Sequence, residues 1–549
     1  MRALFLLSVF FYLSSSIHAQ LADQIADIMI PFSGSENAGA SVAILKEGRL
    51  IFQAEYGMAN LEYEEAMDAQ TIIALGSVSK HFTTLALLLL EDRGLLSLDD
   101  SIHDYLPELP DYGRPISLRQ IAWHVSGIRS NLELLGLQGF GPADALSSQF
   151  VRQMIFDQSK LNFSPGEDWS YSNSGYFLLA DVVTIVSGQD FEDFMETEIF
   201  SPLGMDQTFV MTDYEAILPN RSYSYYQLPN GSYINAIMNR SSIGSTGIWT
   251  TMENFIKWGE NFTSYKLGSR DLFSRLTTEG KLLNGRGIDY GLGLALGEYH
   301  GVPMYHHGGG TSGYRSYLSH LPDLKLTILL LSNNGNFNGE MISKQIIDLI
   351  YPELLEGHNT VQEGSQSIDL TDHLGRYIND SYHYTRDIIE RNDSFFIRYP
   401  WGDSKIIFNQ DNKLFVPEHN LTLQFATDST GIDFLHIIID DQIANSYHRF
   451  DEVVLSSSEL KQYPGLYYSS EINTVYKLVL VDDQLMIHHS RIGDIVLTPY
   501  QKDYFTGASW RLNGIQFKRN AVGEITGFSV STNRNCGIYF NKFNLEEMD

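Results

Sequence analysis

Residues 74–93 form an almost unbroken apolar run, with polar side chains concentrated near its beginning. A helix that is apolar on nearly all sides packs inside a protein, and this one is too short to span a bilayer. Gly94, a residue type that favours helix C-termini, follows the run. The first turn carries Ser77, Ser79 and Lys80. The pattern therefore predicts a buried central helix with a polar cluster at its N-terminus.

Strand patterns lie on both sides of this helix, far apart along the chain. Between them, residues 95–260 show mostly helical periodicity with long loops. Strands at both ends with helices between predict an α/β region: one antiparallel sheet built from distant segments, flanked by helices, with an all-α subdomain inserted. The predicted strands are 40–45, 50–56, 314–321 and 324–331, and a helix is predicted over 341–351.

The chain becomes β-rich after a polar stretch, residues 355–368, which predicts a linker. Short strands then recur at regular spacing in a weak internal repeat, which predicts two small antiparallel, lipocalin-like β-barrels. In this repeat 374–377 echoes 460–463, 387–399 echoes 476–489, and 412–415 echoes 502–505. The predicted organisation is a signal peptide (1–19), an α/β domain (20–354), the linker (355–368) and two barrels (369–455 and 456–549).

Composition narrows the class of protein. The chain has 549 residues, of which 43% are hydrophobic and 12% aromatic, which is ample for packed cores. Its formal charge of −30 argues against nucleic acid or an anionic membrane as a partner and favours solubility as the meaning of the charge. The single cysteine, Cys536, excludes an intrachain disulfide and argues against a cysteine nucleophile.

The N-terminus predicts export. Met1-Arg2 is followed by an apolar stretch and then by a small residue, Ala19, at a plausible cleavage site. An N-terminal anchor is the alternative, but the apolar stretch is short for one. No cysteine follows the cleavage point, which argues against a lipoprotein. We therefore expect a secreted or periplasmic protein with no membrane span once the signal is removed.

The polar residues of the central helix have the parts of an activated nucleophile. Ser77 and Lys80 are three residues apart, so they share a helix face, and the amine can take the hydroxyl proton. The simpler interpretation is a helix cap with a solvated lysine. The same Ser-x-x-Lys pattern occurs at Ser458 to Lys461, in a polar stretch with no buried helix behind it. The pattern alone is therefore not decisive.

Two further stretches carry candidate chemistry. Tyr171 and Asn173 lie two residues apart in a loop, so an extended backbone would point both into one pocket. The other stretch is His306-His307 followed by consecutive glycines, whose backbone N–H groups could bind an oxyanion. The simpler interpretations are a core tyrosine with a capping asparagine, and a flexible loop with surface histidines. No acidic residue lies at metal-ligand spacing from the histidines.

Taken together and in this order, the stretches resemble the motifs of the serine β-lactamase and penicillin-binding-protein superfamily. The motifs read Ser77-Val-Ser-Lys80, Tyr171-Ser-Asn173 and His307-Gly-Gly309, although His306-His307-Gly308 also fits the third pattern. The resemblance covers about residues 21–352. Flanking stretches are similar to the class C-like branch, namely 94–100, 105–107, 124–127, 165–166 and 202–205.

The resemblance implies a catalytic role for four residues. Ser77 would be the acylated nucleophile, Lys80 and Tyr171 would share general acid–base work, and His307 would complete the set. The backbone N–H groups of Ser77 and Gly310 would bind the oxyanion. The implied substrate-binding residues are Asn173, Gly308, Gly309 and Gly310.

The third motif also bears on the substrate. Lysine usually occupies it in β-lactamases, whereas His-x-Gly and two terminal barrels are more similar to D-aminopeptidases and esterases. The resemblance therefore implies an exported serine hydrolase of D-aminopeptidase, D-Ala-type carboxypeptidase or esterase type, acting through an acyl-enzyme. A true β-lactamase, or a non-catalytic penicillin-recognising or glycan-binding protein of the same fold, is the alternative. An α/β-hydrolase would need a Gly-x-Ser-x-Gly elbow, which the sequence lacks.

These interpretations define the expected partners. We expect a small-molecule or short-peptide substrate. We expect no cofactor, metal or nucleic acid, and the sequence leaves the oligomeric state open.

Overall fold

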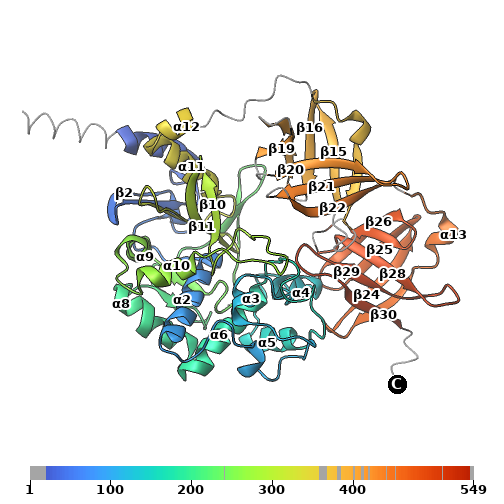
Figure 1. Ribbon diagram of the computed structural model, residues 1–549, viewed down its shortest axis with the longest axis horizontal. Helices are drawn as coiled ribbons and strands as arrows, with labels where there is room; N and C mark the ends of the chain where they lie inside the picture. Colours follow the sequence, from blue (N-terminus) through green and yellow to red (C-terminus); the bar gives the residue numbers. More distant parts are fainter. Residues whose placement is uncertain are drawn as a thin grey trace, which may run out of the picture. The chain divides into compact units, whose positions relative to one another are not determined.

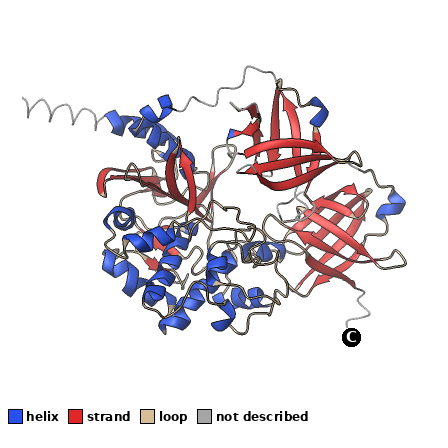
Figure 2. Ribbon diagram, in the orientation of Figure 1, coloured by secondary structure: helices blue, strands red, loops and turns tan. Residues whose placement is uncertain are grey.

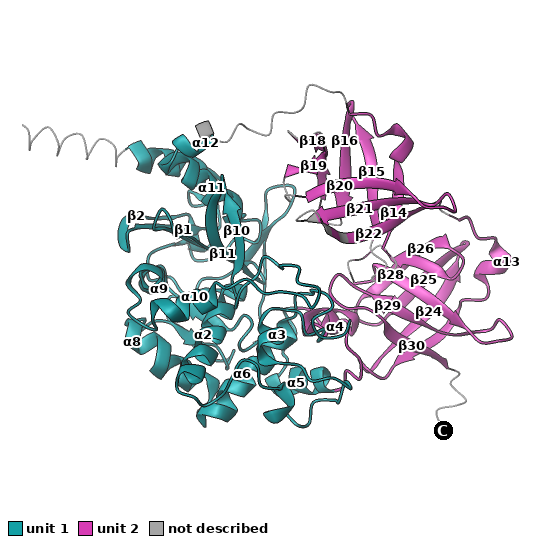
Figure 3. Cartoon of the chain, viewed as in Figure 1, with its two compact units in different colours: residues 1–128, 142–156, 163–358 teal, residues 129–141, 157–162, 359–549 magenta. Residues whose placement is uncertain are grey.

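The protein is described here from a computed structural model. It describes residues 20–239, 242–357, 368–379, 385–399, 402–409, 413–417, 421–439, 442–451, 453–507, 509 and 511–543. These form two compact units (Figure 3). The first contains the described residues up to 128, with 142–156 and 163–357, and the second contains 129–141, 157–162 and the described residues from 368 on. The predicted signal peptide and most of the predicted linker lie outside the described residues.

The first unit is built on an antiparallel sheet with the strand order β10-β11-β12-β13-β1-β2 (Figure 1). β1 pairs with β13 although almost the whole unit separates them in sequence. The strands predicted at the two ends of this region therefore do form one sheet. Their bounds are β1 (Ala40–Lys46), β2 (Arg49–Tyr56), β10 (Ala295–Tyr299), β11 (Val302–Thr311), β12 (Tyr314–Leu321) and β13 (Leu326–Ser332).

β13 is buried at every position, and apolar at all but Thr327 and Ser332, because both faces of the sheet are covered. Ile328 and Leu330 pack in one buried cluster with Ile346 of α11 (Gly339–Ile350). Leu329 points the opposite way, against Gly259 of α9 (Met252–Ser264). A strand covered on both faces loses the alternation of a half-exposed strand, which accounts for its nearly continuous apolar sequence.

The helices of the first unit gather around α2 (Ser79–Asp92), which packs beside α6 (Asn173–Ser187; Figure 1). α2 is buried along almost its whole length. Its Phe82 ring lies 4.2 Å from the ring of Trp258. Other α-helices of this unit include α3 (Leu118–Ala122), α5 (Ser148–Phe156), α7 (Phe191–Met195), α8 (Ser201–Leu203), α10 (Arg270–Leu276) and α12 (Glu353–Gly357). The predicted buried central helix is confirmed, with a later start than expected.

The second unit consists mainly of strands (Figure 2). Its first sheet is nearly closed, because its edge strands β17 (Gly402–Lys405) and β18 (Ile407–Phe408) are consecutive in the chain. Its second sheet is a closed barrel in which β23 (Gly465–Ser469) pairs with β30 (Ile538–Phe543). The predicted pair of antiparallel barrels is confirmed. The remaining strands of the two sheets are β14 (375–378), β15 (385–391), β16 (394–399), β19 (414–416), β20 (421–427), β21 (433–439), β22 (442–450), β24 (474–481), β25 (484–489), β26 (493–501), β27 (504–507), β28 (514–519) and β29 (525–531).

The internal repeat is real, but its first segment was aligned wrongly. Tyr377 of β14 and Tyr467 of β23 are equivalent, because each hydroxyl donates to the carbonyl four residues earlier, at 2.9 and 2.7 Å. The prediction instead paired Tyr377 with Tyr463. Tyr463 precedes its strand, β23, so the pairing based on sequence similarity lies four residues too early. The hairpins β15–β16 and β24–β25 do correspond as expected.

The second unit also includes two segments from the middle of the predicted α/β domain. One of them carries α4 (Asn131–Leu137), which the sequence assigned to the inserted helical subdomain. Arg129 at its start is buried, pairs with Glu471 at 3.0 Å and donates to the carbonyl of Cys536 at 3.0 Å. The second barrel therefore packs against residues that lie more than 300 positions earlier in the chain.

Candidate active site

Ser77 lies just before the central helix rather than within it. It occupies a 3₁₀ turn, η2 (Gly76–Val78), and the α-helix begins at Ser79. The expected helix over 74–93 is wrong at this end because Gly76 adopts a left-handed backbone conformation, with φ at +52°. The turn still brings the predicted pair together: Lys80 Nζ lies 3.3 Å from Ser77 Oγ.

Lys80 is fully buried and held by three oxygen atoms. Besides Ser77 Oγ, its Nζ donates to Asn173 Oδ1 at 2.7 Å and to the carbonyl of Ser245 at 3.0 Å. The same nitrogen lies over the ring of Tyr171, 4.6 Å from its centroid. A solvated lysine is therefore excluded, and the amine is aimed at the serine hydroxyl.

Asn173 is the first residue of α6 and does not continue an extended loop. Ser172 caps this helix, with its hydroxyl accepting from Gly175 N at 3.3 Å. The expected extended backbone is present at Ser172, with φ at −124° and ψ at 117°, and the chain enters the helix only at Asn173. As predicted, Tyr171 and Asn173 point into one place, because both contact Lys80, one through its ring and the other through its amide oxygen.

The glycine run lies on β11 and packs against the backbone of the nucleophile turn. A Cβ on Gly309 would lie 2.0 Å from the carbonyl oxygen of Leu75, and one on Gly76 would lie 2.6 Å from Gly310 N. Any side chain at Gly309 or Gly76 would therefore push the strand and the turn apart. This close approach places the backbone of Gly310 beside Ser77, where the oxyanion donors were expected. Gly308 is less confined, since its nearest neighbour would be Tyr317 at 3.6 Å.

His307 is buried on the face of β11 that Tyr171 occupies, with the two ring centroids 6.2 Å apart. Its Nδ1 lies 2.7 Å from the carbonyl of Gly308, which can only accept, so Nδ1 carries a proton. In the neutral ring Nε2 then accepts from the hydroxyl of Tyr290, at 3.0 Å. Burial, helped by the positive charge of Lys80, lowers the pKa of His307 to about 3. The imidazole is therefore neutral at physiological pH.

His306 faces the other side of the strand. Its Nδ1 lies 3.1 Å from the hydroxyl of Tyr317, which belongs to the apolar cluster under α11. Alternation along β11 thus separates the two histidines, and His307 is the one beside Tyr171. This geometry favours His307-Gly-Gly309 as the register of the third motif.

Two groups of this cluster were missed by the sequence. Tyr290 bonds His307, and its burial raises its pKa well above the usual range, so the hydroxyl stays protonated. Ser245 contributes only its carbonyl oxygen to Lys80. A backbone carbonyl has no sequence signature, and Tyr290 lies outside any recognisable motif. Neither could be found without the folded chain.

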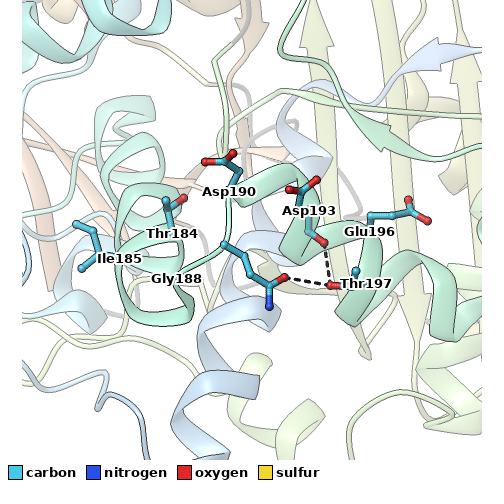
Figure 4. Close-up of a pocket in the computed structure, with 8 residues that line it drawn as sticks. Thr184, Ile185, Gly188, Asp190, Asp193, Glu196 and Thr197 are labelled. Atoms are coloured by element: carbon cyan, nitrogen blue, oxygen red, sulfur yellow. Dashed lines mark hydrogen bonds between the residues drawn. The ribbon is translucent and has the colours of Figure 1, made fainter.

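A pocket of about 730 Å³ opens beside the cluster, at the end of β11 that β10 leaves unpaired. Its lining includes Trp169, Tyr171, Tyr290, His307, Gly308, Gly309, Gly310 and Arg315. Another pocket, of about 810 Å³, lies between α6 and α7 (Figure 4). Its residues include Asp190, Asp193 and Glu196, and Thr197 there bonds the carbonyl of Asp193 at 2.8 Å. That pocket contains none of the predicted chemistry.

Within the described ranges, no cluster of three or more histidine, cysteine or acidic side chains could hold a metal ion. Nor does any helix in that part of the chain combine the length and apolar character needed to cross a bilayer.

Known proteins are similar to this one in sequence and in fold. Residues 25–349 match the Beta-lactamase family. A D-aminopeptidase of Gluconobacter oxydans is 27% identical over 335 residues, which cover 61% of this chain and 62% of that protein. A D-aminopeptidase of Brucella canis is 27% identical over 299 residues, which cover 54% of this chain and 57% of that protein. The matches thus span less than two thirds of these relatives.

The fold is also similar to that of an octameric penicillin-binding protein homologue from Pyrococcus abyssi. That structure superposes with a TM-score of 0.54 and 17% identity, covering 88% of this chain and 99% of that one. At this identity the likeness concerns the fold. Because the matched residues 25–349 make up more than half of the 549-residue chain and contain Ser77, Lys80 and His307, this protein belongs to the Beta-lactamase family.

Proposed function

We propose that this protein is a serine hydrolase that acts through an acyl-enzyme, with Ser77 as the nucleophile. The observation that carries the proposal is the position of Lys80, whose buried amine lies 3.3 Å from Ser77 Oγ and is fixed by Asn173 and Ser245. A buried amine with few water neighbours can lose its proton more easily than a solvated one, and can then act as a base.

The proton route follows from these contacts. Unprotonated Lys80 takes the hydroxyl proton while Ser77 Oγ forms a bond to the substrate carbonyl carbon. The bond to the amine or alcohol then breaks, and that group leaves with a proton supplied by Lys80 or Tyr171. Water attacks the resulting ester by the reverse route, releasing the acid and restoring the serine.

The negative charge on the carbonyl oxygen needs donors close to Ser77. The backbone N–H groups of Ser77 and Gly310 are proposed for this role, since the Gly310 backbone packs directly against the nucleophile turn. Neutral His307 holds the neighbouring wall of the pocket through Tyr290. It adds no positive charge to attract a substrate carboxylate.

We propose a small amide, peptide or ester as the substrate. The names of the D-aminopeptidase relatives and the neutral histidine of the third motif support this class over a β-lactam. A chromogenic cephalosporin, p-nitrophenyl esters and D- and L-aminoacyl anilides should be compared on one preparation. Faster turnover of the cephalosporin would reverse the ranking.

Export is part of the proposal and rests on residues 1–19 alone. Expression of the full chain with a C-terminal tag, followed by N-terminal sequencing of the secreted product, tests it. Cleavage after Ala19 is expected, and an uncleaved N-terminus on cell-associated protein would contradict export.

A fluorophosphonate probe tests the nucleophile. The intact protein should be labelled on Ser77, and Ser77→Ala should abolish both labelling and turnover. Ser458→Ala is the matched control, because Ser458 has a lysine three residues on but lies in the short helix α13 (Ser457–Leu460), which is not part of the cluster. Folded wild-type protein that neither labels nor hydrolyses any of the panel would favour a non-catalytic binding protein.

A further inference from the structure

His124 accepts hydrogen bonds from the residues immediately before and after Tyr171. Its backbone carbonyl accepts from Ser170 N at 3.0 Å, and its side-chain Nδ1 accepts from Ser172 N at 3.1 Å. The residues immediately before and after Tyr171 are therefore both bonded to one histidine.

The same imidazole packs against the tyrosine ring. The centroids of His124 and Tyr171 lie 4.3 Å apart, and the histidine is 1% exposed. Tyr176 and Tyr290 surround it further, with centroids at 5.1 and 5.0 Å. The ring and the two hydrogen bonds together restrain both the backbone and the side chain of Tyr171.

His124 adopts a conformation that few residues accept. Its φ of +61° lies in the left-handed region, directly after α3, and its N–H donates to Ile121 at 3.0 Å. A left-handed conformation is unfavourable for a bulky side chain other than asparagine, aspartate or histidine. The turn thus aims both hydrogen-bonding groups of His124 at the Tyr171 segment.

The bond to Ser172 also reaches Lys80. Ser172 caps α6, whose first residue, Asn173, accepts from Lys80. The Ser172 N–H can only donate, so Nδ1 must be unprotonated for this bond to exist. His124 therefore fixes two of the neighbours of the lysine amine, the Tyr171 ring and the Asn173 amide, through one segment.

We infer that His124 is a positioning residue for the hydrolytic reaction, holding Tyr171 and Asn173 in register with Lys80. This inference rests on the proposed function. Because Tyr171 and Lys80 transfer protons, loss of the restraint should lower kcat and leave KM nearly unchanged. Small misplacements of reacting groups cost roughly 10²-fold in rate.

Three variants separate the contributions of His124. His124→Gly keeps the left-handed backbone but removes the acceptor and the ring. His124→Phe keeps a ring but removes the acceptor, and it also strains the left-handed backbone. His124→Asn keeps an acceptor near the Nδ1 position and tolerates positive φ. We expect kcat to fall by roughly 10²-fold in the Gly and Phe variants and by less than about 10-fold in the Asn variant. KM should stay within a few-fold of wild type in all three.

Hydrogen exchange gives a readout that does not depend on activity. The amide of Ser172 should be protected in wild type and in His124→Asn, and should exchange faster in His124→Gly and His124→Phe. His320→Asn is the matched control: His320 is also buried in the first unit, bonds Thr327 at 2.9 Å and lies outside the site. That variant should lower the thermal midpoint without changing kcat or Ser172 exchange.

The outcomes distinguish this inference from the proposed function. Faster Ser172 exchange with unchanged kcat in folded His124→Gly would overturn the inference while the hydrolase assignment stood. A kcat loss in His124→Asn equal to that in His124→Gly would also overturn it. Absence of turnover and labelling in wild type would instead overturn the proposed function.

Discussion

The Lys80 amine donates to a neutral side chain, the amide of Asn173, and the absence of charge on this amide affects the chemistry of the amine. Asn173 Oδ1 accepts from Nζ at 2.7 Å without adding a charge, whereas a carboxylate at this position would favour the protonated amine. A lysine that must act as a base needs its neutral form to be accessible. The amide of Asn173 orients the Lys80 amine without stabilising its protonated form by an opposite charge.

Asn173→Asp should therefore shift the acidic limb of the pH profile of kcat/KM to higher pH and lower activity at neutral pH. An opposite charge within hydrogen-bonding distance shifts the pKa of a group by roughly one to three units in favour of its charged form. Initial rates of ester hydrolysis between pH 5 and 10 measure the shift. Asn173→Leu, which adds no charge, should lose activity without moving the limb, and an unmoved limb in Asn173→Asp would remove Lys80 as the titrating base.

His307 links the site to the stability of the fold. Its pKa is lowered by burial to about 3, whereas in the unfolded chain a histidine titrates near pH 6.5. Between these values the unfolded state binds a proton that the folded state does not. The free energy of unfolding therefore falls as pH drops below about 6.5 and continues to fall toward pH 3.

His307→Gln should remove this component. At pH 5 wild type should have lost about 2 kcal/mol of stability through His307 relative to pH 7.5, and the variant should lack that loss. Urea unfolding at both pH values, followed by tryptophan fluorescence, gives the difference. Parallel pH dependence in the two proteins would contradict a neutral buried His307.

At the scale of elements, the site depends on how closely β11 approaches η2. Gly309 and Gly308 are neighbours on one strand and face opposite sides of the sheet. A Cβ at Gly309 would lie 2.0 Å from the Leu75 oxygen and 2.2 Å from Ser316 Oγ, whereas one at Gly308 would meet nothing closer than 3.6 Å. The two positions form a matched pair for testing this contact.

Gly309→Ala should lower kcat/KM by roughly 10²-fold, since the strand must move away from the nucleophile turn. It should also lower the thermal midpoint. Gly308→Ala should leave the thermal midpoint close to wild type, since the added methyl would meet nothing closer than Tyr317 at 3.6 Å. Ester turnover and thermal unfolding of the two variants test the contact, and equal behaviour of the pair would show that the glycine at 309 is not required for it.

At the scale of the whole molecule, the second unit includes residues from the middle of the first. Segments 129–141 and 157–162 belong with the second barrel, where Ser130 and Asn535 exchange backbone and side-chain hydrogen bonds at 2.7 and 2.9 Å. Tyr476 of the barrel donates to the carbonyl of Leu137 at 2.7 Å. The predicted α/β domain, 20–354, therefore does not coincide with the first compact unit, which lacks residues 129–141 and 157–162.

A fragment of residues 20–357 should be less stable than the full chain for this reason. Its segment 129–141 would expose buried groups that find their partners after residue 470. We expect limited proteolysis to cut the fragment within 129–162 and to spare the same stretch in the full chain, as read by mass spectrometry. Equal resistance of the two proteins would contradict this.

Much of the site was visible in the sequence. Ser77, Lys80, Tyr171 and His307 were each found from local patterns, and the structure brings them into one cluster. Tyr290 and the Ser245 carbonyl were not found, because their roles depend on contacts between distant segments. The role of His124 also needed coordinates, since its bonds reach nearly 50 residues along the chain.

The sequence by itself determined the apolar core helix, the sheet built from strands at both ends of the α/β region, the paired barrels and the order of the motifs. Burial periodicity and short motifs are local properties, so they can be read along the chain. Only the tertiary structure decided where the nucleophile turn begins, which histidine lies beside Tyr171, and to which unit residues 129–141 belong. Those outcomes depend on backbone approach at Gly76 and Gly309 and on side-chain partners far away in sequence. Local patterns carry no record of such contacts.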